Sequence, residues 1–254
     1  MATEFAGTGD PSRSMALLWH TASSHRRPGP KASLDVDRLV TAAVRLADAE
    51  GLHSLSMRRV AAELGVAAMT LYSHVPGRGE LVDLMHDSVL GELYADGPPT
   101  GNWRTRLEAV ARANRDLFRR HPWAVHPATG RPPLGPGLMR KYEMELRAVD
   151  GLGLSEAQMD LLVTLVNGFV RGTVGSVHQQ SDGEGGRLAE DRWRSAMAPH
   201  AERFLDAGRF PAAARVLPVA GNDLPGTHAP ERSFEFGLER LLDGIGMLLL
   251  NASR

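Results

Sequence analysis

The sequence contains no cysteine, and this absence removes several kinds of site at once. A chain of 254 residues without a thiol cannot form a disulfide, use a thiolate nucleophile or bind a metal through sulfur. The first residues do not contain a basic segment followed by an apolar segment, so we see no signal peptide. No apolar run comes near the roughly 20 residues that span a bilayer. We therefore expect a cytoplasmic protein that does not enter a membrane.

An excess of positive charge is also missing. The formal net charge is −1, and Lys31 and Lys141 are the only lysines, so any contact with DNA must come from a local basic patch. The motifs GxSxG, GxGxxG and HExxH and the phosphate-binding P-loop are absent. We therefore expect a protein that is not an enzyme, with no catalytic residues, no cofactor and no metal site.

Helical periodicity is present along most of the chain, and no segment alternates with the period of two that strands show. We predict an all-α fold with a boundary at Gly97-Pro98-Pro99. The predicted parts are a disordered arm over 1–32, a small helical domain over 33–93 whose first helix is capped by Ser33, and a larger helical bundle over 98–254. In the larger part, helices are expected near 103–119, 135–150, 156–180, 187–207 and 231–251.

The stretch VAAELGVAAMTLYSHVPGRGEL, over residues 60–81, joins two helices through Gly65. Two helices linked by a short glycine-containing turn form a helix-turn-helix unit, whose second helix lies in the major groove of DNA. Here the second helix, near 67–74, carries short polar and methyl-bearing side chains that can approach base edges closely. Leu71 is expected to anchor it in the core. From spacing alone, an ordinary helical protein is an equally good interpretation.

The residues themselves favour DNA binding, because 33–93 resembles the DNA-binding domain of the tetracycline-repressor (TetR) family of transcription regulators. The resemblance has no gaps, and its most specific parts are Leu55-Ser56, Val60-Ala61, Leu64-Gly65-Val66, Thr70-Leu71-Tyr72 and His74-Val75. It implies a three-helix DNA-binding domain with its helix-turn-helix at 56–75. The DNA-binding residues that it implies are Ser56, Arg58, Ala68, Met69, Thr70, Tyr72, Ser73, His74 and Arg78.

The resemblance also implies individual roles. Ser56 corresponds to a capping hydroxyl near a phosphate, and Arg58 to a residue that can reach a base. Arg78 corresponds to a lysine at the start of the next helix, where free backbone N–H groups also favour a phosphate. Phosphate contacts are implied for Tyr72 and His74, and Thr70 can offer its methyl group to thymine. Ala68 and Met69 replace the Gln and Pro of the tetracycline-specific pattern, so the operator sequence is left open.

The charge of this domain is uneven. Over 33–93, five arginines stand against nine acidic residues, but three of those arginines lie within 56–78, against Glu63 alone. The DNA-facing side can therefore be basic while the rest is not. The arm adds Arg26, Arg27 and Lys31, and basic arms can enter the minor groove. A solvated tail without DNA contact is an equally good interpretation of these three residues.

Two helices of the C-terminal part are expected to form a dimer interface. The segment 159–177 is apolar almost all round, and its glycines at i, i+4 and i+7 would let another helix approach closely. The last helix carries a broad apolar stripe. In TetR-like proteins these two helices pair with their symmetry mates in a four-helix bundle, and an intrachain core is the alternative. The predicted interface residues are Gly168, Gly172, Gly175, Leu238, Leu241, Ile245 and Leu248.

The segment 121–146 resembles, more loosely, the C-terminal domain of the tetracycline-repressor type. The residues expected to line an apolar ligand pocket are Trp123, His126, Met139, Tyr142, Met159 and Phe169. Methionines and aromatics at helical spacing are, however, more often core residues. His126 lies near a family histidine that meets a metal–drug complex, but no partner ligand has matching spacing, so no metal site is predicted.

These observations predict a homodimer that binds double-stranded DNA at a palindromic operator and is released by a small-molecule effector of unknown identity. A repressor is the preferred interpretation. An activator and an effector-independent DNA-binding protein are the alternatives, and an enzyme built on a helical bundle is the least favoured.

Overall fold

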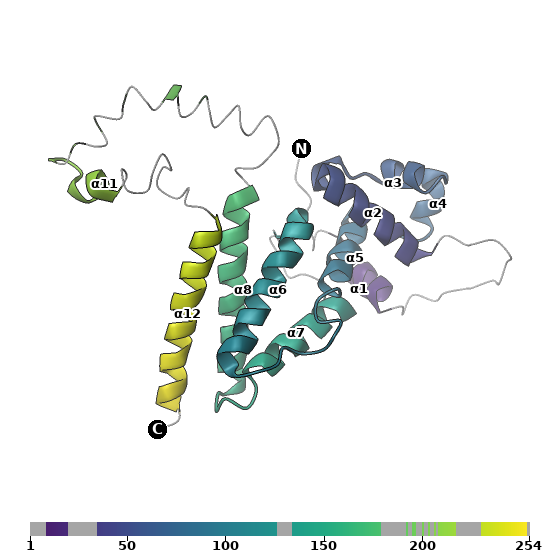
Figure 1. Ribbon diagram of the computed structural model, residues 1–254. Coiled ribbons are helices and arrows are strands. Elements are labelled where there is room, and N and C mark those ends of the chain that lie inside the picture. Colours follow the sequence, from purple (N-terminus) through teal and green to yellow (C-terminus); the bar gives the residue numbers. More distant parts are fainter. Residues whose placement is uncertain are drawn as a thin grey trace.

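The computed structural model describes residues 9–19, 35–125, 134–178, 208–216 and 230–252, with a few single positions between 192 and 206. Within these ranges every regular element is a helix, as the sequence predicts. The small domain and the larger bundle lie side by side, with α3 and α4 at one end and α12 at the other (Figure 1). No helix in the described ranges has both the length and the apolar character needed to cross a membrane.

The small domain contains five helical segments. They are α2 (Val36–Glu50), the 3-10 turn η1 (Leu52–Ser54), α3 (Met57–Glu63), α4 (Ala68–Tyr72) and α5 (Arg78–Leu90). Helix α2 begins later than expected, because Asp35 is its N-cap and accepts a 2.8 Å hydrogen bond from the backbone N–H of Arg38. Ser33, the expected cap, lies outside the described residues. Leu39, Val60, Leu71 and Leu81 are fully buried and hold these helices together.

Residues 11–18 differ from the expectation of a disordered arm, because they form helix α1 (Pro11–Leu18). Ser14 of α1 is fully buried against α5, and its Oγ donates to Asp83 Oδ2 at 2.5 Å. Leu18 joins the core of the small domain. The indole Nε1 of Trp19 donates to the carbonyl of Leu134 at 2.8 Å, just before α7. Helix α1 thus connects α5 to the chain that enters the larger bundle (Figure 1).

Deletion of residues 1–19 is expected to destabilise the protein. Leu18 would leave the core and the buried Asp83 carboxylate would lose a hydroxyl donor, so the free energy of unfolding should fall by about 2–4 kcal/mol. Urea unfolding followed by circular dichroism measures this loss. Trp19→Phe is the control, since it removes only one exposed hydrogen bond. An unchanged urea midpoint after the deletion would show that α1 contributes nothing to stability.

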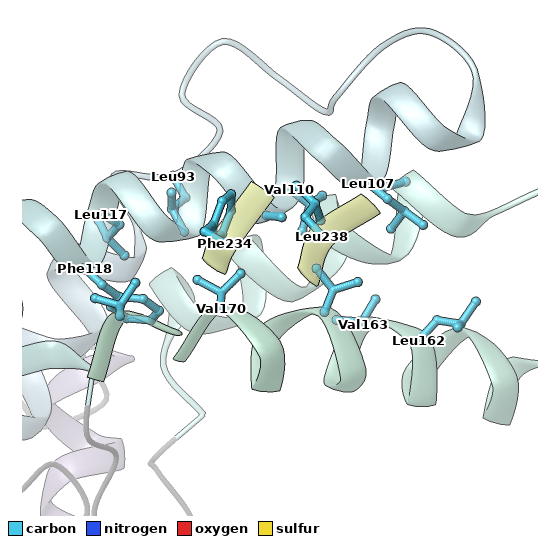
Figure 2. Packing of buried hydrophobic residues seen from close by; sticks show 14 of the residues in the cluster. Leu93, Leu107, Val110, Leu117, Phe118, Leu162, Val163, Val170, Phe234 and Leu238 are labelled. Carbon is cyan, nitrogen blue, oxygen red and sulfur yellow. The ribbon is translucent and has the colours of Figure 1, made fainter. Parts of the chain in front are cut away.

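The larger bundle follows the predicted helices closely. It contains α6 (Trp103–Arg120), the 3-10 turn η2 (Pro122–Ala124), α7 (Pro136–Val149), α8 (Glu156–His178) and α12 (Pro230–Ala252). The helix expected over 187–207 falls largely outside the described residues, and the short α11 (Pro211–Val216) was not expected. Figure 2 shows the core of the bundle, where Phe234 and Leu238 of α12 lie among side chains of α6 and α8.

Helix α5 belongs to both parts of the molecule. Its first half packs in the small domain, whereas Val89 and Leu90 lie in the core of the larger bundle. Asp87 of α5 also caps α7: its Oδ2 accepts from the N–H of Gly137 at 2.9 Å and its Oδ1 from the N–H of Leu138 at 2.8 Å. A side chain at position 137 would collide with the main-chain carbonyl of Asp87, so only glycine allows this close approach.

Candidate DNA-binding and effector sites

The turn between α3 and α4 is a Schellman motif, in which two backbone hydrogen bonds close the end of a helix. Gly65 has a φ of +66° and donates its N–H to the Ala62 carbonyl at 3.1 Å, and Val66 donates to the Ala61 carbonyl at 3.0 Å. Ser56 caps the start of α3, as predicted, by accepting from the N–H of Arg59. The residues of this turn therefore set the angle between α3 and α4.

Helix α4 is anchored at one residue and open on the rest of its surface. Leu71 is fully buried, while Met69 is 77% exposed and Tyr72 46% exposed. Thr70 and Ser73 are also exposed, and Ala68 and His74 are half-buried. This short helix thus presents methyl, hydroxyl and phenol groups to solvent from a rigid support, which is the surface that contact with base edges requires.

The neighbouring arginines of α3 differ in their partners. Arg59 forms an ion pair with Glu50 at 2.5 Å, whereas Arg58 is exposed and no acid among the described residues pairs with it. Arg78, the expected phosphate contact, is half-buried: its Nε donates to the Leu55 carbonyl at 3.0 Å and its Nη2 to the Leu52 carbonyl at 2.8 Å. Of these three guanidinium groups, only that of Arg58 extends into solvent without an ion-pair partner in the described structure. Arg78 supports η1 through these two hydrogen bonds.

A second site lies inside the larger bundle, where polar side chains from α5, α6, α7 and α8 meet. We call it the buried polar cluster, and it consists of the buried His86, Asn114, Lys141, Glu145 and Asn167 with the half-buried Arg171. Glu145 is 1% exposed and lies at its centre. Its Oε2 accepts from Lys141 Nζ at 2.7 Å and from Asn167 Nδ2 at 2.9 Å, while its Oε1 accepts from Asn114 Nδ2 at 2.6 Å and from the Tyr94 hydroxyl at 3.0 Å.

The electrostatics of this cluster are unusual for a core. Burial lowers the pKa of His86 to about 4, and the nearby Arg171 and Lys141 act in the same direction, while the Ala124 backbone opposes them. Burial also lowers the pKa of Lys141, which its pairing with Glu145 partly offsets. Two buried atoms, Asn114 Oδ1 and Arg171 Nε, have no hydrogen-bond partner among the described residues. Unpaired buried polar atoms destabilise a core, so these two atoms are a cost to the stability of the bundle.

His86 is expected to make stability depend on pH. Its folded pKa of about 4 lies below the ordinary 6.5, so the unfolded chain takes up the proton first and stability falls as the pH drops from 6.5 toward 4. At pH 5 the loss from this residue should be about 2 kcal/mol relative to neutral pH. Urea unfolding of His86→Gln should show a flatter pH dependence than the unchanged chain. His53→Gln, at an exposed position, is the control, and equal pH dependence in all three proteins would contradict the assignment.

The predicted pocket residues do not form one site. Trp123 lies at the junction of the two parts, where its Nε1 donates to Asp48 Oδ1 at 2.7 Å, and Phe169 packs between α8 and α12 against Phe234. The Tyr142 hydroxyl donates to Asp160 at the surface. Met139 is 38% exposed, Met159 is half-buried at the edge of the core, and His126 lies outside the described residues.

The helices expected to form the dimer interface leave an apolar surface uncovered. We call it the open face, and it consists of Leu161, Leu165, Gly168 and Gly172 on α8 with Phe236, Gly244, Met247 and Leu250 on α12. Leu161, Phe236 and Met247 are each more than 60% exposed. A Cβ atom added at Gly168, Gly172 or Gly244 would meet nothing within 4 Å. The two helices pack against each other, so the open face extends over neighbouring helices (Figure 1).

Part of the predicted interface lies elsewhere. Leu238 and Ile245 are 2% and 3% exposed in the single chain, and Gly175 is also buried, so these residues belong to the intrachain core. Leu241 is half-buried against the same core. Gly168, Gly172 and Leu248 are exposed, as an interface residue of an isolated chain should be. The two helices named by the sequence therefore both carry exposed apolar side chains, and their role in a dimer interface stays a prediction.

The chain is similar to known proteins over both of its parts. Residues 39–85 match the family model described as "Bacterial regulatory proteins, tetR family", and residues 96–249 match "Tetracyclin repressor-like, C-terminal domain". The chain is 42% identical over 256 residues to the HTH-type transcriptional repressor DrrR1 of Streptomyces coeruleorubidus, covering 98% of this chain and 90% of that protein. The identity to the HTH-type transcriptional repressor Rv1353c of Mycobacterium tuberculosis is 28% over 245 residues, with coverages of 92% and 88%.

A solved structure extends this similarity to the arrangement of the helices. The TetR family protein ActR of Streptomyces coelicolor, in complex with actinorhodin, aligns with a TM-score of 0.68 at 30% identity. The alignment covers 87% of this chain and 97% of that one. Both parts of the molecule therefore have counterparts in a single known protein.

Proposed function

We propose, starting from the fact that this chain belongs to the TetR family of bacterial transcriptional regulators, that it represses transcription as an effector-responsive homodimer. In this proposal the dimer holds a palindromic operator and releases it when a small molecule binds inside the larger bundle. The observation that carries the proposal is α4, a short polar helix held on buried Leu71 directly after a helix-turn-helix turn.

In this proposal α4 enters the major groove. Thr70 would contact base edges or a thymine methyl group, and Tyr72 and His74 the flanking phosphates. Met69, the most exposed large apolar side chain of α4, fits a role in contacting bases beside Ala68. Arg58 reaches the groove from α3, and Ser56 and Ser73 lie near the DNA backbone. Arg78 supports this surface from behind, and the arm residues Arg26, Arg27 and Lys31, outside the described residues, remain candidates for the minor groove.

The open face would pair with its copy in the dimer. Large exposed apolar areas on a soluble protein mark interaction surfaces, and small residues let helices approach closely. A two-fold dimer presents two copies of α4, whose separation matches a palindrome with half-sites about one helical turn apart.

The buried polar cluster supports the effector part of the proposal. It joins α7 and α8 to α5, and α5 continues into the small domain that carries α4. A ligand that binds better to one arrangement of these helices would shift α5 and change the separation of the two α4 helices. The dimer would then grip only one half-site well. That ActR has been crystallised in complex with actinorhodin supports a small-molecule effector.

Arg58→Ala is expected to weaken operator binding by roughly 1–3 kcal/mol and to relax base preference at one position in each half-site. The reason is that Arg58 is exposed and has no ion-pair partner in the described structure, so its guanidinium can bind a base edge. Fluorescence anisotropy on single-base variants of a palindrome from the DNA beside this gene measures both effects.

Arg59→Ala is the matched control, because Arg59 already pairs with Glu50 on the protein. Its affinity should change little and evenly across the variants. Equal behaviour of the two alanine variants would remove Arg58 from the set of base-reading residues. Failure of the unchanged protein to prefer any palindrome would contradict the proposed function itself.

A further inference from the structure

Arg171 of α8 is a half-buried cation whose Nε has no hydrogen-bond partner among the described residues. It follows Asn167 by one helical turn, so both residues lie on the inner side of α8, and its Nε is shielded from solvent. Among the described residues, no acid forms an ion pair with it and nothing accepts a hydrogen bond from that nitrogen. Burial lowers the pKa of Arg171, and Glu145 only partly opposes this effect.

The acids near Arg171 are already occupied. Glu145 accepts hydrogen bonds from four donors, of which Lys141 is the charged one. Asp87, the other buried acid on the neighbouring part of α5, binds the N–H groups of Gly137 and Leu138. His86 is uncharged at neutral pH, because its pKa is about 4. The described side chains of the cluster therefore hold two positive charges against one negative charge, and a cation that is partly shielded from water without a counter-charge is costly in free energy.

The residues around the cluster indicate which chemical groups a ligand would need besides a negative charge. Val170 and Val174 lie beside Arg171 on α8 and are buried, and Leu117 and Phe118 follow Asn114 on α6. Asn114 offers a buried carbonyl oxygen, Oδ1, that no described donor uses. A complementary molecule thus needs an apolar skeleton, one negative charge and one hydrogen-bond donor.

We infer that the effector is a mostly apolar molecule carrying one acidic oxygen group, a carboxylate or an ionised phenol, which binds Arg171, with a hydroxyl directed to Asn114. This inference rests on the proposed function and specifies the chemical class of its effector. The acidic group would supply the negative charge that the described residues lack at this position.

The first test needs no ligand. Arg171→Met, which keeps an unbranched side chain about as long as the aliphatic stem of arginine and removes the charge, should melt several degrees higher than the unchanged protein, since an unpaired charge shielded from water opposes folding. Arg112→Met is the control: Arg112 forms a two-bond ion pair with Glu235, at 2.6 and 2.8 Å, near the surface. This variant should not melt higher. A lower melting temperature for Arg171→Met would show that Arg171 is needed for folding, and the inference would fail.

The second test compares matched acids and amides on the full-length protein. The probes are naphthalene, anthracene and hydroxyanthraquinone carboxylic acids, each paired with its primary amide, titrated by tryptophan fluorescence. At least one acid should bind about tenfold or more tightly than its amide, the factor expected of one charge-assisted hydrogen bond, and Arg171→Met should abolish that preference. The inference is overturned if no acid exceeds its amide, or if the preference survives in Arg171→Met.

Measuring operator release distinguishes the inference about the acidic effector from the proposal of an effector-responsive repressor. A neutral amide that binds and releases the palindrome would contradict the acidic class while leaving the effector-responsive repressor intact. An acid that binds through Arg171 without changing operator affinity would leave the site assignment intact and contradict the proposed repressor mechanism. For either result, the same anisotropy titration with operator DNA is the measurement.

Discussion

Gly172→Leu is expected to convert the proposed dimer into a folded monomer. Gly172 lies in the middle of the open face on α8, where an added Cβ meets nothing within 4 Å of its own chain. The leucine side chain therefore costs the protomer little, but it occupies the space that a second copy of α8 would fill. Affinity for a palindromic operator should fall about 100-fold or more, while half-site binding should remain, because the second half-site contributes through effective concentration.

Sedimentation velocity and circular dichroism together test this prediction. A monomer that keeps its helical signal supports the open face as the dimer interface. The matched control is Gly237→Leu on α12, where the first side-chain carbon would lie 2.5 Å from Phe169 Cε2 of the same chain. That variant should lower the free energy of unfolding by roughly 1–3 kcal/mol or more. A Gly172→Leu protein that stays dimeric would show that the interface lies elsewhere.

Lys141→Met is expected to destabilise the protein by about 3–5 kcal/mol, because it leaves the Glu145 carboxylate buried without its ion-pair partner. The double variant Lys141→Met, Glu145→Gln should recover much of this loss, since the glutamine is neutral and still accepts a hydrogen bond. Urea unfolding of the four members of this cycle measures the coupling between the two residues.

A surface pair provides the comparison for the buried one. Arg147 and Glu143 are also four residues apart on α7 and 2.8 Å apart, but both side chains are more than half exposed. Arg147→Met should therefore cost less than about 1 kcal/mol. If Lys141→Met costs no more than Arg147→Met, then Glu145 is not held as a buried anion, and the charge balance of the cluster must be different.

The sequence predicts the DNA-binding region well because its information is local. Ser56 caps the helix that follows it, Gly65 forms the turn at its own position, and Leu71 anchors a helix that is only five residues long. Each of these signals acts within a few residues. The role of Arg78 is different, because its side chain reaches back to carbonyls more than twenty residues earlier. No sequence pattern around Arg78 shows that its guanidinium already donates hydrogen bonds to the main chain.

The C-terminal part is harder to read, and two helices show why. Helix α8 is apolar almost all round, so its periodicity does not tell which side meets its own chain and which side remains open. For this reason the sequence predicts an exposed Gly175, which the structure buries, and does not predict that Leu161 is exposed. Helix α6 does carry a usable signal: Asn114 falls on a stripe otherwise formed by Val110, Ala111, Leu117 and Phe118. A polar residue on a buried stripe indicates a core polar site, but its partners come from α7 and α8 and cannot be found from α6 alone.

The N-cap of α7 comes from another helix, and this has a consequence for how the larger bundle can move. Most helices carry their capping side chain in their own sequence, so the cap travels with the helix. Helix α7 begins at Pro136 after a glycine without a capping side chain, and Asp87 of α5 supplies the carboxylate instead. Sliding α7 along α5 would break both hydrogen bonds together, because one carboxylate makes them. Small displacements of α7 are therefore resisted, and a larger displacement occurs only when both hydrogen bonds break. The hydrogen-exchange rates of the Gly137 and Leu138 amides should report this joint breakage as two distinct levels of protection rather than a gradual change.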